Sequence, residues 1–345
     1  MARPSMVIIP TRIATLVVAV VSLSAALLSA PTAVAERLPA TPKTSVEVYD
    51  DFGRTGYSLA DYQQKWSNPF GLGEMSSSDT RLFSRGAFKV SAVPFKTGAD
   101  FSVFDHLKYI AISNKSFQVP VSGSLEISSK IKASTPGTEP GRVIHGTYLE
   151  SGAPYAEATL EGQQAGVVMN VIDFSTGQLF DWFVSGGTAF ALIERLPSNV
   201  TGNAPKGSSD YVGREKMYTQ IIKEIPASPG AHTVSIRINR NANKSSVDYF
   251  FDGQLIAQVN TIGVPLDVQD APYSGIYPSL GAGEDLTTKV NSVVIGHGLF
   301  SLLDAFPFQH PEAPELSVSI PLNERLFGQG ATGTFDNFRV KTVIG

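Results

Sequence analysis

The chain has 345 residues, a formal net charge of −4 at pH 7 and no cysteine. The slight acidic excess argues against nucleic acid as a partner, because a surface that follows phosphates needs clustered Lys and Arg. The missing thiols exclude disulfide bonds, a cysteine nucleophile and zinc sites built on thiolates.

Residues 1–35 are expected to be a secretory signal peptide. Arg3 and Arg12 supply positive charge, residues 13–28 form an apolar run rich in Ala, Val and Leu, and Ala33-Val34-Ala35 offers small residues at the cleavage spacing. A membrane anchor is the alternative, but the run is short and no charged stop follows it. We therefore expect a secreted protein with no membrane span once the signal is removed.

A polar leader at 36–45 is expected to be flexible and to precede the first strand. The segment 53–79 is loop-like, and Trp66 is its expected packing anchor, since a buried Trp contributes a large apolar area. Stacking of Trp66 on a ligand is the less favoured alternative.

The rest of the chain predicts a single domain at 46–343 that is all-β. Clean alternation at 123–133 and 232–239 indicates strands with one buried and one solvated face. The Asp252-Gly253 pair between apolar runs predicts a tight hairpin. About twelve to fourteen such strands, with no helical stripe between them, predict an antiparallel two-sheet β-sandwich rather than a parallel sheet.

The clearest piece of sheet lies in the middle of the chain. Apolar runs at 167–172, 179–184 and 188–194 are separated by short polar breaks, Ser175-Thr176-Gly177 and Ser185-Gly186-Gly187. Breaks of this length, rich in Gly and Ser, are typical of tight hairpins. This segment is therefore predicted to be a three-stranded antiparallel meander.

Two-residue turns in both hairpins, Thr176-Gly177 and Gly186-Gly187, would make Ile172 face Asp181 and Asp181 face Leu192. Glu194 would face Leu179. Asp181 and Glu194 then lie diagonally on the same face of the sheet, with their Cβ atoms about 7–8 Å apart. A three-residue second turn would put them on opposite faces, because a one-residue slip inverts every side chain. The expected polar face holds Asn170, Ile172, Leu179, Asp181, Phe183, Phe190, Leu192 and Glu194. The expected core face holds Val171, Phe180, Trp182, Val184, Ala189, Ala191 and Ile193.

Three short motifs resemble the concanavalin A-like lectin/glucanase jelly roll, in which the first and last strands lie side by side. They are Tyr49-Asp50-Asp51-Phe52, the hairpin at 247–253, and Phe335-Asp336-Asn337-Phe338-Arg339-Val340. Two longer blocks, 160–197 and 323–340, look like an exported family of uncharacterised function within that fold. The resemblance covers almost all of the expected domain.

The resemblance also carries expectations about chemistry. In the glucanase branch one strand carries Glu, Asp and Glu at alternate positions; no Glu-x-Asp-x-Glu occurs here, so that activity is not implied. Many members hold a structural calcium between the first and last strands, which makes Asp336 and Asp51 calcium candidates, although Asp at strand ends also caps turns. No other cofactor is expected.

The residues of the meander suggest two kinds of site. The expected separation of Asp181 and Glu194 falls between those of retaining and inverting glycosidases, so a glycoside hydrolase or polysaccharide lyase is one hypothesis, with His145 as a further catalytic candidate. Aromatic rings beside carboxylates also suit sugar binding. The leading expectation is non-catalytic recognition of a glycan or other polar extracellular ligand on a concave sheet; a structural or surface-interaction protein without a small-molecule site is the third hypothesis. The expected ligand-binding residues are Asn170, Asp181, Phe183, Phe190 and Glu194.

Overall fold

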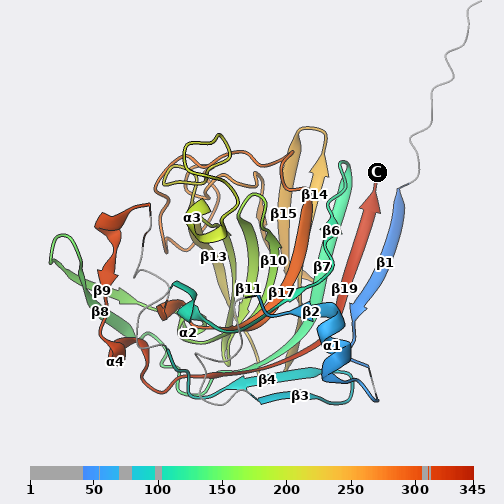
Figure 1. Cartoon of the computed structure of the whole chain (residues 1–345), viewed down its shortest axis with the longest axis horizontal. Helices are drawn as coiled ribbons and strands as arrows, with labels where there is room; N and C mark the ends of the chain where they lie inside the picture. The colour runs from blue at the N-terminus through green and yellow to red at the C-terminus, as the bar shows by residue number, and fades with distance from the viewer. Residues whose placement is uncertain (1–41, 54, 70–79, 98–102, 305–309, 311) are drawn as a thin grey trace, which may run out of the picture. The chain divides into compact units, whose positions relative to one another are not determined.

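Two large antiparallel sheets pack face to face as a sandwich in the computed structural model (Figure 1). The predicted all-β two-sheet sandwich is confirmed. The expected signal peptide, 1–35, lies outside the described residues, and no helix in the described part is long and apolar enough to span a membrane. The structure describes residues 42–53, 55–69, 80–97, 103–304, 310 and 312–345.

The first sheet, sheet A, is built around β19, the last strand of the chain. The first half of β19 pairs with β4 and its second half pairs with β1 (Lys43–Asp50), so the first and last strands lie side by side, as the resemblance implied (Figure 1). β1 begins within the expected leader. Apart from β1, which pairs with β19, the strands of sheet A in spatial order are β16 (Gln254–Val259), β15 (Lys244–Phe251), β14 (Ala231–Asn241), β7 (Gly123–Ser134), β19 (Ala331–Ile344), β4 (Phe88–Ala92) and β3 (Thr80–Phe83).

The second sheet, sheet B, contains the predicted meander. In spatial order it holds β13 (Tyr218–Pro226), β12 (Thr188–Arg195), β11 (Gln178–Val184), β10 (Gly166–Asp173), β17 (Ser292–Phe300), β5 (Leu107–Ser113) and β2 (Trp66–Ser67), and β6 (Phe117–Gln118) pairs with β17. A small third sheet holds β18 (Val318–Ser319), β8 (Val143–Tyr148) and β9 (Pro154–Ala158).

Short helices occupy several connections, and one corrects the prediction of a loop at 53–79. Ser58 and Asp61 form a capping box: the Ser58 hydroxyl accepts from the Asp61 N–H, and the Asp61 carboxylate accepts from the Ser58 N–H. This pairing satisfies the free N–H groups of a first turn and so starts a helix there. The helices are α1 (Leu59–Lys65), η1 (Val103–His106), α2 (Glu161–Gln164), α3 (Ser198–Thr201), η2 (Leu302–Asp304), η3 (Pro314–Leu316) and α4 (Leu322–Arg325).

The meander is formed by β10, β11 and β12, with one register correction. The second turn has two residues, Gly186 and Gly187, so Asp181 pairs with Leu192 and Leu179 with Glu194, as predicted. The first turn is longer, because the Asp173 carboxylate accepts from the backbone and hydroxyl of Ser175; the predicted pairing of Ile172 with Asp181 is therefore wrong. The shift is of two residues, so each side chain keeps its predicted face.

The predicted core face is confirmed. Phe180 and Trp182 are fully buried between the sheets, and Trp182 Nε1 donates to the backbone oxygen of Ser235 on β14. Trp66 is also buried, at 1% exposure, and its Nε1 donates a 2.7 Å hydrogen bond to the buried carboxylate of Asp50. Trp66 is thus a packing anchor.

Candidate functional site

The polar face of the meander is covered, where an open concave sheet was expected. Phe183 and Phe190 stack with ring centroids 4.7 Å apart and are each no more than 1% exposed. Two glycines permit this closure: a Cβ at Gly162 of α2 would lie 2.7 Å from the Phe190 ring, and one at Gly166 would lie 2.7 Å from the Phe183 ring. The sugar-stacking role expected for the two rings does not fit their place in the structure.

Asn170 and Asp181 pair on this covered face. Asn170 Nδ2 donates a 2.8 Å hydrogen bond to Asp181 Oδ1, and both side chains are at most 2% exposed. Gly296 of β17 provides the space, since a Cβ there would lie 2.9 Å from Asn170 Oδ1. Burial raises the pKa of Asp181 well above its usual value, and the nearby charge of Glu194 raises it further.

Glu194 lies on the same face as Asp181, as predicted, but closer to solvent. Its Oε2 accepts a 2.8 Å hydrogen bond from Thr219 Oγ1 on β13. Burial raises the pKa of Glu194 to about 7, against the opposing effect of the Thr219 hydrogen bond. The structure therefore places two carboxyl groups with raised pKa values on one face of the meander.

His145 does not join this pair. Neighbouring side chains of a strand point to opposite sides; Ile144 is buried, and the His145 side chain is 65% exposed. Its Nδ1 lies 3.4 Å from Glu324 Oε2, at a shallow cavity lined by residues of β8 and of the segment 319–324. The expectation that His145 neighbours the two carboxylates is wrong for this reason.

The calcium candidates lie near each other. Asp51 accepts a hydrogen bond from the Gly53 N–H in a local turn. Burial raises the pKa of Asp336, and the charge of Asp51 raises it further. No cluster of three or more His, Cys, Asp or Glu side chains suited to a metal ion occurs within the described ranges. Calcium binding here stays a prediction.

A cavity that the sequence did not predict lies beside Thr219, the hydrogen-bond partner of Glu194. We call it the tyrosine pocket; its volume is about 220 Å³. Tyr148 ends β8, Tyr155 lies on β9, Tyr218 begins β13 and Tyr277 lies in the connection between β16 and β17, so segments far apart in the sequence meet there. Its lining residues are Tyr148, Tyr155, Met217, Tyr218, Thr219, Tyr277, Pro278, Leu280, His310 and Leu316.

The tyrosines of the pocket are held in place by packing and hydrogen bonds. Tyr148 and Tyr155 meet edge to face with ring centroids 5.7 Å apart. The Tyr155 hydroxyl donates to Glu157, and Gln163 Nε2 donates a 2.7 Å hydrogen bond to the Tyr277 hydroxyl. Burial raises the pKa of Tyr155 and of Tyr277, so both hydroxyls stay protonated at neutral pH. Fixed, neutral rings of this kind suit recognition of an uncharged ligand.

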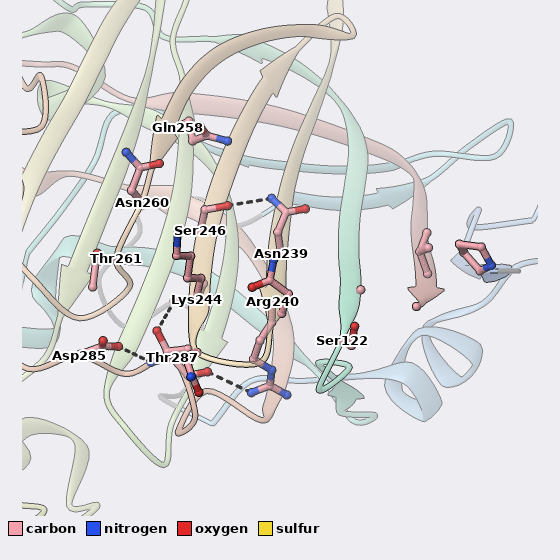
Figure 2. Close-up of a pocket in the computed structure, with 17 residues that line it drawn as sticks. Ser122, Asn239, Arg240, Lys244, Ser246, Gln258, Asn260, Thr261, Asp285 and Thr287 are labelled. Carbon is pink, nitrogen blue, oxygen red and sulfur yellow. Dashed lines mark hydrogen bonds between the residues drawn. The ribbon is translucent and has the colours of Figure 1, made fainter. Parts of the chain in front are cut away.

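A second, larger cavity of about 750 Å³ lies where β14 and β16 end and β15 begins, and we call it the polar groove (Figure 2). No aromatic side chain is among its lining residues. Several of its polar groups already bind one another: Asn239 Nδ2 donates to Ser246 Oγ at 3.1 Å, and the Thr287 N–H donates to Asp285 at 2.8 Å. The polar groove is thus the weaker candidate for a ring-shaped ligand.

Solved structures to which the chain is similar share little sequence with it. An endo-1,3-beta-glucanase from Streptomyces sioyaensis is 10% identical, with 89% of this chain and 100% of that chain covered and a TM-score of 0.43. Beta-agarase B from Zobellia galactanivorans is 11% identical, with 88% and 95% covered and a TM-score of 0.41. Alginate lyase A1-II′ is 11% identical, with 88% and 95% covered and a TM-score of 0.37.

The family itself is clear from sequence. No curated protein matches the chain. A family model, described as a family of unknown function, matches residues 49–343, which is nearly all of the described chain. The resemblance to a family of uncharacterised function is confirmed: the chain belongs to the family of unknown function DUF6081.

Proposed function

We propose that the protein is an exported carbohydrate-binding protein that holds one sugar ring in the tyrosine pocket without catalysis. The observation that carries the proposal is the convergence of Tyr148, Tyr155 and Tyr277 on one cavity. Sugar rings present C–H faces that stack on aromatic side chains, and phenol hydroxyls exchange hydrogen bonds with sugar hydroxyls.

The size of the pocket limits the ligand. Sites for drug-sized ligands measure roughly 300–1,000 Å³, so a cavity of about 220 Å³ suits one ring rather than a chain of them. Charge limits it as well: the pKa of Glu194, behind Thr219, is raised to about 7, which disfavours a full negative charge beside the wall of the pocket. A neutral sugar fits this environment.

A glycan array of defined mono- and oligosaccharides, followed by calorimetry with the best ligand, tests the proposal. Tyr148→Ala is expected to weaken binding about 5- to 150-fold, taking as a guide the roughly 1–3 kcal/mol that stacking of a nucleic-acid base on one aromatic ring is worth. Phe174→Ala, at an exposed aromatic residue outside the pocket, is the matched control and should bind normally. Silence across the array favours a structural or surface-interaction role, and normal binding by Tyr148→Ala places the site elsewhere.

A glycoside hydrolase or polysaccharide lyase is the second candidate, and the position of Asp181 and Glu194 on one face of the meander favours it. A Glu with a pKa of about 7 suits a general acid near neutral pH. The raised pKa of Asp181 counts against it, because the partner must be ionised to act as nucleophile or base. Release of reducing sugar from polysaccharides, lost in Asp181→Asn and in Glu194→Gln while both variants stay folded, would support catalysis.

A further inference from the structure

A buried charged cluster joins three segments that are far apart in the sequence. Lys108 lies on β5, Asp304 ends η2 and Arg325 ends α4. Lys108 Nζ lies 2.5 Å from Asp304 Oδ2, and both side chains are 0% exposed. Arg325 Nη1 lies 3.2 Å from the other oxygen, Asp304 Oδ1. A second carboxylate, Asp105 on η1, is 1% exposed and close enough for its charge to act on both Lys108 and Asp304.

This environment disfavours an ordinary ion pair. Lys108 Nζ also donates a 2.8 Å hydrogen bond to the backbone oxygen of Lys96. Removing an ammonium and a carboxylate from water nevertheless costs several kcal/mol per ion after relaxation, and close contacts do not always offset that cost. Burial lowers the pKa of Lys108 and raises the pKa of Asp304, in each case against the stabilising charge of the partner. Both pKa values are thus shifted in the direction that favours the neutral forms, and the two groups are in direct contact.

We propose that Lys108 and Asp304 condense to form an intramolecular isopeptide bond. The lone pair of Nζ attacks Cγ of the Asp304 carboxylic acid, a C–N bond forms, the bond from Cγ to Oδ2 breaks, and one water leaves. The reaction needs no oxidant or other co-reactant, because an amine and a carboxylic acid give an amide and water.

The neighbouring side chains match the needs of this step. Negative charge develops on Oδ1 as the tetrahedral intermediate forms, and Arg325 donates to that oxygen. Asp105 is a further buried carboxylate whose charge acts on both partners, and it can accept the proton that Nζ loses and return it to the departing hydroxyl. After condensation the amide oxygen still accepts from Arg325, so the donor keeps its partner.

The bond would supply a cross-link that this chain lacks. The sequence has no cysteine, so no disulfide can form. Lys108 and Asp304 are 196 residues apart, and a covalent link across so long a loop removes much of the conformational freedom of the unfolded chain. The link would also join η2 covalently to β5 of sheet B.

Intact-mass spectrometry of the purified full chain, with its first residue fixed by its N-terminal peptide, tests the proposal. The wild type is expected to be lighter than its sequence by one water. Lys108→Arg keeps the positive charge and the ion pair but should not condense, so its mass should equal that of its sequence. A tryptic digest of the wild type should contain a branched peptide joining the segments around Lys108 and Asp304, with no cleavage after Lys108.

Two further variants separate the isopeptide bond from other causes. Asp252-Gly253 can also lose water, by forming a cyclic imide, but that loss would persist in Lys108→Arg. Asp105→Asn should keep the fold and slow condensation, so that the uncondensed mass accumulates. A wild-type mass equal to that of the sequence, or normal tryptic cleavage after Lys108, overturns the proposal and leaves a buried ion pair.

Discussion

Thr219 on β13 donates a 2.8 Å hydrogen bond to Glu194 on β12, and this bond links the tyrosine pocket to the covered carboxyl pair. One side of the Thr219 residue lines the cavity while its hydroxyl is directed at Glu194. Any change in the ionisation of Glu194 therefore acts directly on a wall of the pocket. The same contact makes the pH dependence of folding a probe of this part of the molecule.

We expect Glu194→Gln to stabilise the protein at alkaline pH relative to the wild type. The pKa of Glu194 is raised to about 7 in the folded chain, so the folded state binds more protons than the unfolded state and the wild type loses stability as pH rises from about 4.5 through 7. Gln keeps a hydrogen-bond acceptor for Thr219 but does not ionise. Thermal unfolding should show that the free energy of unfolding of the variant, relative to that of the wild type, increases by on the order of 1–3 kcal/mol from about pH 5 to about pH 8.5. An equal difference between the two proteins at both pH values would contradict the raised pKa.

Asp50→Ala should destabilise the protein strongly. The buried Asp50 carboxylate accepts hydrogen bonds from Trp66 Nε1, from the Tyr57 hydroxyl and from Lys65 Nζ. Its removal takes this acceptor away from all three donors. Breaking a buried charged network by removing one partner costs about 3–5 kcal/mol. Asp51→Ala, at the exposed neighbouring position, is the control and should change the free energy of unfolding by no more than about 0.5 kcal/mol. Urea denaturation of the three proteins measures the difference.

Phe183→Ala should act on folding rather than on recognition. The ring is buried against Phe190 and Phe300, so its removal leaves a cavity and costs about 3–5 kcal/mol of stability. The dissociation constant of the folded fraction for any sugar found on the array should stay that of the wild type. A folded Phe183→Ala protein with selectively lost binding would show that the covered face opens to ligands.

Asp252→Asn should weaken the protein at acidic pH more than at alkaline pH. His232 Nδ1 lies 2.7 Å from Asp252 Oδ2 and Nε2 lies 2.8 Å from the Ser228 oxygen, so the doubly protonated ring can donate both bonds. Burial lowers the pKa of His232, but these two acceptors outweigh it and the pKa is raised. The stabilisation is complete below about pH 6.5 and is lost as pH rises through the raised value.

For this exposed partner the expected loss in Asp252→Asn is about 0.5–1 kcal/mol at about pH 5.5 and less at about pH 8.5. Chemical denaturation at the two pH values measures it. Asn tolerates the left-handed backbone conformation that Asp252 adopts, so the variant tests the charge rather than the turn. A larger loss at the alkaline value would mean that the neutral ring makes the stronger contacts.

The sandwich and its meander could be predicted because their signals are local. Alternation of side chains and the Gly186-Gly187 turn set the faces of β11 and β12, and the structure confirms both the turn and the faces. The length of the first turn depended on one side-chain contact of Asp173, which alternation does not record. The two-residue error in the first turn left the side chains of β10 on their predicted face, and the correctly predicted second turn placed Asp181 and Glu194 on one face.

The candidate site could not be predicted because it is assembled by long-range contacts. Whether a sheet face is open depends on what packs over it, and here Gly162 allows α2 to close on Phe190. The four tyrosines of the pocket come from β8, β9, β13 and a distant connection, with no shared spacing in the sequence. His145 was misplaced for a similar reason, since strand alternation does not tell which side of β8 meets the rest of the molecule.

The position of β19 has a consequence for how the protein is made. This strand, 14 residues long, pairs with β7 along its length and with β4 and β1 on its other side, so it lies inside sheet A although it comes last in the described chain. Sheet A cannot close until these residues have left the ribosome, whichever strands form earlier. A chain stopped just before Ala331 would lose the interior of a sheet rather than an edge, and would leave β1, β4 and β7 as open templates for pairing with other chains.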